Sequence, residues 1–379
     1  MKRKSELKLD KKDRDLLYLL DVNGRLTYSQ LGKRTKMSKQ LVKYRIERLE
    51  SEGFIKGYFT MIDTSRLGFT TFRVYLKFRN LTPEKKEKVI EYLKEQKQIW
   101  AVVILAGKWD MALGISVKEI YDFYNIWEEL LNKYLDLIGD YKICIYSPVY
   151  HYAKSYLINK EDTSQIRILG GREKIDFDDR DIKILIGLSK NARISLLDLS
   201  ELLKMTPESI SYRIKQLKNK GIIQGYRAMI DVYKLGYEFY KAEIRLSNYN
   251  QIEDILKFCH RHPNIYQVDK TIGGETLEVE FHVTSLKEML KIIEEFERLF
   301  PKVIERFDYL TVLSEEKTTY MPINWLIYPT TALILLIPAE TDSSFIILKC
   351  PMSFVWDTCG PVQNSFENHP LLSLLSKMV

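Results

Sequence analysis

The N-terminal segment has the hydrophobic period of helices. Val42, Ile46 and Leu49 recur at steps of four and three residues and form one apolar stripe. Ser38 has a side chain that caps helix starts, and Gly53 suits the left-handed conformation in which many helices end. Two shorter stretches upstream also read as helices. The predicted helices are Asp13–Leu20, Thr27–Thr35 and Ser38–Glu52.

Further along the chain, the pattern changes to strands separated by helical stretches. The elements follow the order strand, helix, strand, strand, helix, strand. This order fits a ferredoxin-like sheet with helices on one face. The predicted strands are Thr71–Phe78, Trp100–Ala106, Asp110–Val117 and Tyr141–Tyr150, and the predicted helices are Pro83–Glu95 and Lys118–Tyr134.

The whole pattern occurs twice. Residues 13–68, moved by 168 positions onto residues 181–236, are identical at 21 of 56 positions without a gap. The run Tyr44-Arg45-Ile46, for example, returns as Tyr212-Arg213-Ile214. A period of about 165 residues is a complete folding unit and is too long for a solenoid repeat. The sequence is therefore a tandem duplication of one module.

The second copy predicts the same elements as the first. Ile210, Ile214 and Leu217 repeat the helical stripe. Pro207 stands where the first turn of a helix tolerates proline. The sheet half of this copy predicts strands Phe239–Leu246, Ile265–Ile272, Leu277–Val283 and Val303–Leu313, and helices Ile252–Arg261 and Leu286–Leu299.

Composition narrows the class of protein. The chain has 379 residues, 45% of them apolar, enough for about two to four domains with substantial cores. Four cysteines in this length form no disulfide framework and fit a reducing compartment. The start of the chain is charged and lacks a secretory signal, and the apolar stretches are shorter than a membrane span. We therefore expect a cytoplasmic protein without a membrane partner, and exclude collagens, disordered polymers and transporters.

The charge of the chain is unevenly distributed. The net charge is only +7, but residues 1–60 alone carry 16 Lys and Arg against 8 Asp and Glu, a net of +8. Residues 171–226 carry 11 against 8, and residues 321–379 carry 2 against 4. Basic charge concentrated in one compact segment indicates a polyanionic partner.

The three predicted helices have the spacing of a helix-turn-helix, with a short turn at Lys36-Met37. The polar face of the third helix carries Lys39, Gln40 and Lys43. Lysine contacts guanine, glutamine pairs with adenine, and flanking cations bind phosphates. The alternative is the solvated face of an ordinary amphipathic helix. The candidate contacts to double-stranded DNA in the first copy are Lys36, Lys39, Gln40, Lys43, Tyr44, Arg45 and Arg48.

The second copy is a weaker candidate for DNA contact. Glu208 stands where the first copy has Gln40. A glutamate can accept from cytosine, but phosphates nearby repel it. Two interpretations remain open, in which this copy touches DNA or is mainly structural. Its candidate contacts are Ser209, Ser211, Tyr212, Arg213 and Lys215.

The third helix and the residues after it resemble the leucine-responsive regulatory protein/AsnC family, also called feast/famine regulators. The resemblance extends over about residues 9–150 and 177–313. In the sheet half, it rests more on the order of elements than on motifs. It is carried by Ser38–Tyr58, Ile62-Asp63 and Leu67-Gly68, and again by Thr206–Tyr226, Asp231 and Leu235-Gly236.

The resemblance implies a fold, partners and a ligand. The fold is α+β: two winged helix-turn-helix domains, each followed by a ferredoxin-like βαββαβ ligand-sensing domain. The partners are double-stranded DNA and further copies in a homo-oligomer, or the second copy of the module in a pseudo-dimer within one chain. The ligand is a small effector, usually an amino acid. We expect no cofactor, no metal and no catalytic residue.

Members of this family bind effectors near a Gly-x-x-Asp turn between the middle strands of the sheet. The first copy has this turn as Gly107-Lys108-Trp109-Asp110, whereas the second has Gly273-Gly274-Glu275-Thr276 and lacks the aspartate. Glycine permits a close backbone approach, and a carboxylate can pair with an ammonium group. A plain hairpin turn is the alternative. The candidate effector-binding residues are Gly107, Trp109 and Asp110.

These predictions divide the chain into six segments. The segment between the copies is polar and contains Gly170-Gly171, as expected of a linker. The C-terminal tail holds six of the 11 prolines and matches neither copy, so we expect a poorly ordered extension, with a short helix or strand at Thr331–Ile337. The boundaries are 1–65 and 177–233 for the helix-turn-helix domains, 66–150 and 234–320 for the sensing domains, 151–176 for the linker and 321–379 for the tail.

Other functions compete with DNA-binding regulation. Some siroheme decarboxylases share this fold, but the middle strands of the first copy contain no histidine for such chemistry. A protein that binds other regulators instead of DNA is a further alternative. The set Cys259, His260, His262 and His282 matches no closed zinc pattern. We therefore predict a regulator and no enzyme.

Overall fold

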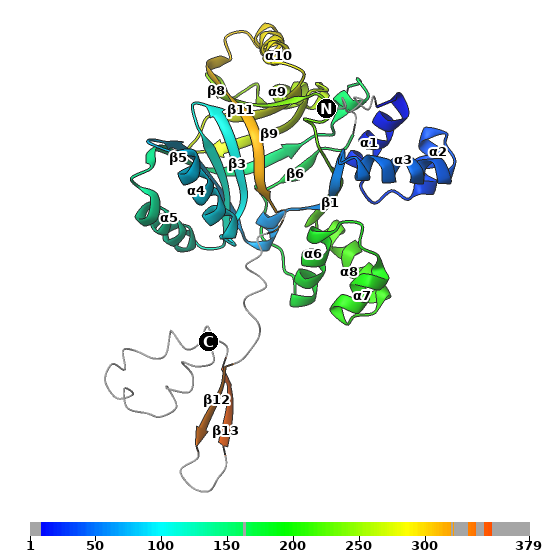
Figure 1. Ribbon diagram of the computed structural model, residues 1–379, viewed down its shortest axis with the longest axis vertical. Helices are drawn as coiled ribbons and strands as arrows, with labels where there is room; N and C mark the ends of the chain where they lie inside the picture. Colours follow the sequence, from blue (N-terminus) through cyan, green and yellow to red (C-terminus); the bar gives the residue numbers. More distant parts are fainter. Residues whose placement is uncertain (1–8, 162–163, 320, 322–332, 339–344, 351–379) are drawn as a thin grey trace. The chain divides into compact units, whose positions relative to one another are not determined.

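The computed structural model describes residues 9–161, 164–319, 321, 333–338 and 345–350 (Figure 1). The chain divides into two compact units, Met1–Ile323 and Asn324–Val379. The larger unit holds both copies of the module. The smaller unit contains an antiparallel pair of strands, β12 (Leu333–Pro338) and β13 (Phe345–Cys350). A short strand in the apolar run of the tail is thus confirmed, whereas the expected poor order of the tail concerns residues outside those described.

The first copy begins with the predicted three-helix unit. Its helices are α1 (Lys11–Val22), α2 (Tyr28–Thr35) and α3 (Lys39–Ser51). The hydroxyl of Ser38 accepts from the backbone N–H of Leu41 and caps α3, as predicted. Between α2 and α3, Lys36 adopts a left-handed φ of 56°, which makes the tight turn of the helix-turn-helix.

The second copy repeats this unit as α6 (Asp179–Lys190), α7 (Leu196–Leu203) and α8 (Pro207–Asn219). Pro207 occupies the first turn of α8, and Lys204 repeats the left-handed turn with a φ of 54°. The helix predictions are confirmed in both copies.

A strand follows each three-helix unit, and the two strands pair with each other. β1 (Ile55–Ile62) and β7 (Ile223–Ile230) form an antiparallel ribbon in which Phe59 lies opposite Arg227. These two positions are equivalent in the copies (59 + 168 = 227), so a pseudo-two-fold axis passes through the pair. Helix α1 packs on β7 and α6 packs on β1, so each helix-turn-helix rests on the strand of the other copy.

Contacts across this axis are reciprocal. The guanidinium of Arg25 donates to the carbonyl oxygens of Ala192 at 2.9 Å and Ile194 at 3.1 Å. Its equivalent, Arg193, donates to the carbonyl oxygen of Leu26 at 3.0 Å. The two copies therefore pair within one chain as a pseudo-dimer.

Each sheet half has the predicted order of elements. In the first copy, the strands are β2 (Thr70–Phe78), β3 (Ile99–Gly107), β4 (Met111–Val117) and β5 (Ile138–His151), and the helices are α4 (Pro83–Glu95) and α5 (Ile120–Tyr134). In the second copy, the strands are β8 (Glu238–Leu246), β9 (Ile265–Ile272), β10 (Leu277–Val283) and β11 (Ile304–Thr318), and the helices are α9 (Ile252–Arg261) and α10 (Leu286–Leu299). Strand β11 is longer than predicted because its second half pairs with β3 of the first copy.

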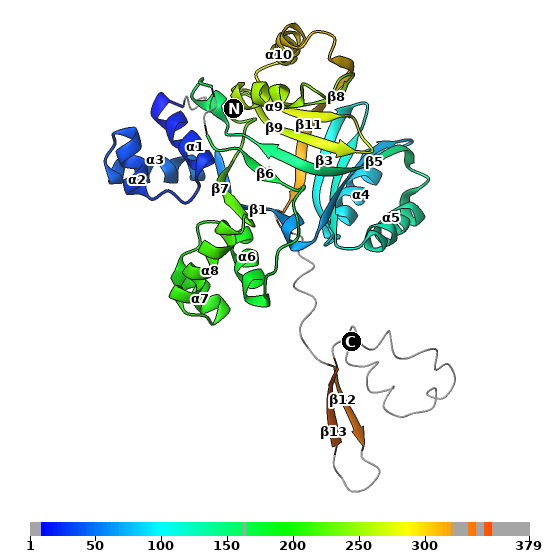
Figure 2. The same ribbon diagram turned by 180° about the vertical axis from the view of Figure 1, so that it is seen from behind.

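These eight strands close into a ring. The pairs β3–β11 and β5–β9 join the two copies, and the pair β2–β5 closes the circle. Helices α4 and α5 cover the outer face of the first sheet, and α9 and α10 cover that of the second (Figures 1 and 2). Alternate strand residues therefore face an interior that both copies share.

The first residues of the connection between the copies are buried. Six consecutive residues, 152–157, have buried side chains. Tyr152 packs into the core beneath α9 and α10, and Tyr156 and Leu157 pack into the core of the first three-helix unit. Strand β6 (Arg167–Leu169) adds to the sheet beside β5. The polar composition of this segment suggested a simple linker, but its few aromatic and apolar side chains fix it to both copies.

Candidate nucleic-acid interface, effector turn and buried ion clusters

The polar face of α3 points to solvent. Val42, Ile46 and Leu49 are fully buried, so the opposite face of the helix is the exposed one. Tyr44 is 63% exposed and Leu41 is 40% exposed on that face. The predicted contacts Lys36, Lys39, Gln40 and Lys43 are also exposed.

Two of the predicted contacts in this copy hold the helices together. Arg45 donates to Asp10 at 2.7 Å and to Asp13 at 2.9 Å, and Arg48 lies 2.6 Å from Asp13. The acidic partners cap the start of α1. The guanidinium groups therefore clamp α1 to α3, whereas the predicted contacts Lys36, Lys39, Gln40, Lys43 and Tyr44 are exposed.

In the second copy, Arg213 makes the contacts that Arg45 makes in the first, but fewer of the predicted DNA contacts on its third helix are cations. Arg213 donates to Asp178 at 2.9 Å and to Asp181 at 2.8 Å. Tyr212 is 64% exposed and Ser211 is exposed, whereas Ser209 is half-buried. On α8, Lys215 is the predicted cation that remains exposed and outside the clamp.

In the predicted effector turn of the first copy, the carboxylate already has hydrogen-bond partners within the chain. The carboxylate of Asp110 accepts from Lys77 Nζ at 2.7 Å and from the backbone N–H of Phe78 at 2.8 Å. Trp109 is only 4% exposed and packs beside Tyr75 in the ring interior, and Gly107 has a φ of 125°. The ammonium group that pairs with Asp110 is thus that of Lys77, a lysine of the same chain.

The corresponding turn of the second copy also carries a buried carboxylate. Glu275 is 4% exposed and forms ion pairs with Arg245 at 2.9 Å and with Arg306. Burial alone would raise the pKa of Glu275, but the two guanidinium groups hold it below its usual value. Thr276 stands where the first copy has Asp110, and the residue before it, Glu275, therefore holds this turn in place through its ion pairs.

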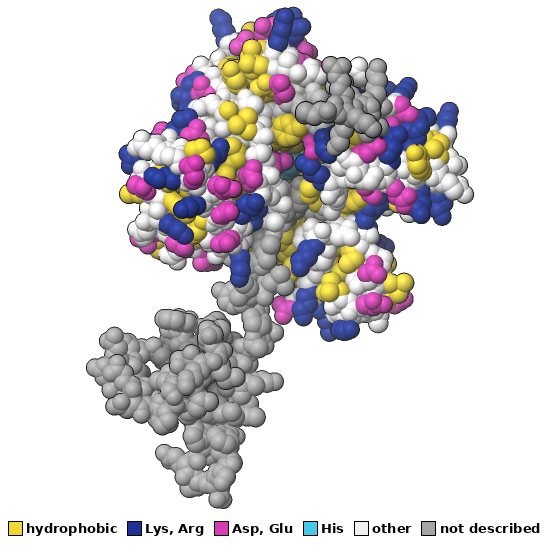
Figure 3. All heavy atoms as spheres, in the orientation of Figure 1, with side chains coloured by type: hydrophobic (Ala, Val, Ile, Leu, Met, Phe, Trp, Pro, Cys, Tyr) yellow, Lys and Arg dark blue, Asp and Glu magenta, His cyan; other side chains and the backbone are white. Residues whose placement is uncertain are grey.

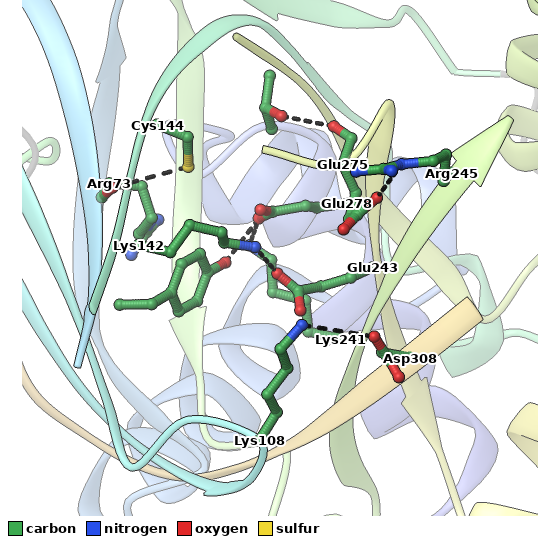
Figure 4. Close-up of polar contacts among 12 residues, drawn as sticks. Arg73, Lys108, Lys142, Cys144, Lys241, Glu243, Arg245, Glu275, Glu278 and Asp308 are labelled. Carbon is green, nitrogen blue, oxygen red and sulfur yellow. Dashed lines mark hydrogen bonds and ion pairs between the residues drawn. The ribbon is translucent and has the colours of Figure 1, made fainter. Parts of the chain in front are cut away.

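The ring interior contains an ion cluster that sequence reasoning missed. Glu278 accepts from Tyr75 Oη at 2.6 Å and from Tyr146 Oη, and its carboxylate lies 2.8 Å from Lys241 Nζ. Lys241 also reaches Asp269 at 3.2 Å and Glu280 at 2.9 Å. Figure 4 shows Lys142, Glu243 and Glu278 converging in this space.

The environment separates the pKa values of these carboxyl groups. Burial raises the pKa of Asp269 to about 7 despite the charge of Lys241. Burial acts in the same direction on Glu278, but Lys241 and Lys142 outweigh it and lower the pKa of Glu278 to about 2. Glu278 is therefore the ionised centre of the cluster.

A second buried cluster lies where the first helix-turn-helix meets the second copy. Asp21, at the end of α1, accepts from Arg227 Nε of β7 at 3.0 Å and from Arg227 Nη2 at 2.5 Å. It also accepts from the backbone N–H of Lys154 at 2.8 Å and from Lys154 Nζ at 3.2 Å. All three residues are buried. This cluster joins three segments that are distant in the sequence.

Lowering the pH from 6.5 to 5 is expected to destabilise the wild-type chain by about 2 kcal/mol relative to a His282→Asn variant. His282 is buried, with Nδ1 2.9 Å from Tyr156 Oη and its ring stacked on Tyr266. Burial and Lys154 lower the pKa of His282, so the folded chain stays neutral there while the unfolded chain binds a proton. Urea unfolding of both chains at each pH measures this. A constant difference between them would contradict it.

The histidine and cysteine residues considered as metal ligands do not come together. Cys259 is buried in the core between α9 and the sheet, whereas His282 faces the ring interior. Among the described residues, no group of three His, Cys, Asp or Glu side chains is placed to hold a metal ion. None of the helices in the described part of the chain has the length and apolar character that a membrane span needs.

Comparison with known proteins agrees with this geometry. A sequence model of winged helix-turn-helix DNA-binding domains matches residues 9–56 and 177–224. The chain is 31% identical over 99 residues to the HTH-type transcriptional regulator LrpB of Bacillus subtilis, covering 26% of this chain and 66% of that protein. It is 37% identical over 123 residues to an uncharacterised HTH-type transcriptional regulator of Pyrococcus furiosus, covering 31% of this chain and 79% of that protein.

A solved structure extends the comparison to both copies. The siroheme decarboxylase NirDL has a TM-score of 0.55 to this chain at 13% identity, covering 82% of this chain and 94% of that one. At this identity the likeness concerns the fold alone.

The two matched segments and the two exposed third helices define a winged helix-turn-helix DNA-binding protein. The chain belongs to the leucine-responsive regulatory protein/AsnC family of transcriptional regulators, and it carries the unit of that family twice.

Proposed function

We propose that the chain is a sequence-specific DNA-binding transcriptional regulator in which the first helix-turn-helix supplies most of the affinity. The observation that carries this proposal is the exposed face of α3, with its lysines, Gln40 and Tyr44 opposite a fully buried stripe. A helix presented in this way fits the major groove. The +8 charge of the first sixty residues supports phosphate contact.

The two reading surfaces in this pseudo-dimer differ. The pair Lys39 and Lys43 in α3 corresponds to Pro207 and Ser211 in α8. A symmetric homodimer reads two equal half-sites, whereas this chain presents two different helices. We therefore propose that its DNA site is asymmetric.

We also propose that a small effector, with amino acids as the class to test first, modulates DNA binding or assembly. The support is the family and the Gly107–Asp110 turn, whose indole and carboxylate face the shared interior and β2. Adding each amino acid in turn to the DNA-binding assay tests this part.

Replacing Lys39 and Lys43 together by alanine is expected to weaken binding to a selected DNA duplex by more than about tenfold. The slope of log affinity against log salt should fall by about 2, one for each lost cation. Fluorescence anisotropy at several salt concentrations measures both quantities, with a duplex chosen by selection from random DNA.

The matched control is Lys287→Ala with Lys291→Ala. These lysines are exposed on α10 with the same spacing of four residues, so the variant loses the same charge outside the helix-turn-helix. We expect it to keep the affinity and slope of the wild type. Equal losses in both variants would contradict the assignment of α3.

A siroheme decarboxylase-like enzyme and a partner of other regulators that does not bind DNA are the competing functions. The enzyme is considered because this chain shares its fold with the siroheme decarboxylase NirDL. Mixing the protein with siroheme and recording the absorption spectrum tests the enzyme. Failure to select any DNA sequence would favour the partner of other regulators.

A further inference from the structure

The outer face of α7 combines exposed leucines with acid. Leu197 is 67% exposed and Leu202 is 63% exposed. Asp198 and Glu201 lie between them around the helix and are also exposed. Large apolar side chains grouped at the surface mark a contact with another molecule.

The same positions of α2 show that the fold does not require these residues. The equivalents in the first copy are Ser29, Gln30, Lys33 and Arg34, all exposed. All four positions differ, and the face changes from two positive charges to two negative ones. Because the helix and its turn are the same in both copies, this difference concerns what the surface meets.

The acidic face of α7 is unsuited to DNA, since the helix before the recognition helix runs next to the phosphates. Figure 3 shows hydrophobic and acidic side chains together on the α6–α8 unit, and mainly basic ones around the hydrophobic patch of the α1–α3 unit. The two units therefore differ in charge but share exposed apolar area.

The chain itself carries a surface that complements α7. On α3, Leu41 and Tyr44 are exposed on one side of the helix surface, and the exposed Lys39 and Lys43 lie beside them, with Lys43 3.6 Å from the carboxylate of Glu47. The α3 face therefore combines exposed apolar area with cations, and the α7 face combines exposed apolar area with carboxylates, so the two faces are complementary in charge.

We propose that the α7 face of one chain docks onto the α3 face of a second copy. Each chain has one surface of each kind, so the proposed assembly has two-fold symmetry, in which two reciprocal contacts join two chains. The docked α3 is the helix that we propose reads DNA, so self-association and DNA binding exclude each other. That exclusion rests on the proposed function, whereas the docking itself does not.

The test uses sedimentation of the full chain without DNA. The wild type should form a species of twice the 44.8 kDa of one chain and dissociate as salt rises from about 50 to 500 mM. The variant replaces Leu197 by Ser, Asp198 by Gln, Glu201 by Lys and Leu202 by Arg. These are the residues of α2, so the helix is compatible with them. Its self-association should be at least about tenfold weaker.

The matched control is Glu294→Lys with Glu297→Lys on α10. Both glutamates are exposed, and this variant gains four positive charges, as the α7 variant does. It should self-associate like the wild type at equal ionic strength. Equal weakening in both variants would make net charge the cause and overturn the docking.

Mixing the two variants tests whether the partner of the α7 face is the α3 face of a second chain. The α7 variant keeps α3 intact, and the Lys39→Ala, Lys43→Ala variant keeps α7 intact. Each alone should associate weakly, whereas the mixture should form a complex through one intact pair of surfaces. A wild type that stays a single chain up to about 100 μM, or a lysine variant that associates like the wild type, would overturn the proposal.

A final measurement adds the selected DNA duplex to the wild type. DNA should convert the two-chain species into single chains bound to DNA. A two-chain species that binds DNA with both α3 helices would overturn the exclusion. A chain that associates as described but binds no DNA supports the docking and contradicts the proposed function, so the two failures are distinct.

Discussion

Replacing Asp21 by asparagine is expected to lower the free energy of unfolding by about 3–5 kcal/mol, because it leaves two buried cations without their counter-charge. Asp21 is fully buried, and its four hydrogen bonds all come from Arg227 and Lys154. Asparagine keeps the shape but presents a single acceptor and no charge. Urea unfolding followed by circular dichroism measures the loss.

The duplication supplies a matched control for this prediction. The positions equivalent to Asp21 and Arg227 are Ser189 and Phe59, so the other side of the pseudo-two-fold axis is built without this ion pair. The double variant Asp21→Ser, Arg227→Phe removes both charges and should be more stable than Asp21→Asn alone. A loss below about 1 kcal/mol in Asp21→Asn would contradict the view that this contact is desolvated.

The contact of Asp21 with Arg227 and Lys154 also makes the stability of the folded chain depend on pH in acid. Burial would raise the pKa of Asp21, but Arg227 and Lys154 hold it well below its usual value. A depressed pKa stabilises the folded state above about pH 4 and loses this contribution as the pH falls further. The Asp21→Asn variant should therefore lose less stability than the wild type between about pH 4 and pH 2.

The three-helix units could be predicted closely because their signals are local. The stripe of Val42, Ile46 and Leu49, the cap at Ser38 and the first-turn proline at position 207 each act within one or two turns of helix. The helices and strands of the sheet halves follow from the same kind of pattern. In each case, the residues that decide the structure are neighbours in the sequence.

The pairing of the copies could not be predicted in the same way. β1 has its partner 168 residues away, and β11 reaches beyond its predicted end because it pairs with β3. In β10, the alternation of Glu278 and Glu280 with apolar residues is typical of a strand with one face in water. Both faces are in fact buried, because the sheet of the first copy covers the charged one.

The candidate sites show the same division. The exposed lysines of α3 follow from the helical period, but the engagement of Arg45 by Asp10 and Asp13 depends on how α1 packs against α3. Retention of this arginine as Arg213 was the available signal, since both copies make the same contacts with the acidic start of their first helix. The shared arginines hold the helices of each copy together, whereas Lys43 and Ser211, which differ between the copies, lie on the exposed faces of α3 and α8.

Replacing Glu278 by glutamine is expected to destabilise the chain by about 3–5 kcal/mol, again by stranding buried cations. Glu278 is fully buried and is the carboxylate nearest to Lys241, at 2.8 Å. Glutamine fills the same volume, so packing is preserved while the charge is lost. The thermal or urea midpoint should fall strongly, whereas Glu297→Gln on the exposed face of α10 should leave it unchanged.

A double-mutant cycle with Lys241→Met separates the ion pair from the packing around it. If Lys241 is the cation that Glu278 compensates, the double variant should be less destabilised than the sum of the two single variants, by about 1–3 kcal/mol. The remaining carboxylates, Asp269 and Glu280, would still lack their lysine, so recovery should be incomplete. Strict additivity would contradict a direct coupling and would leave Lys142 as the principal counter-charge of Glu278.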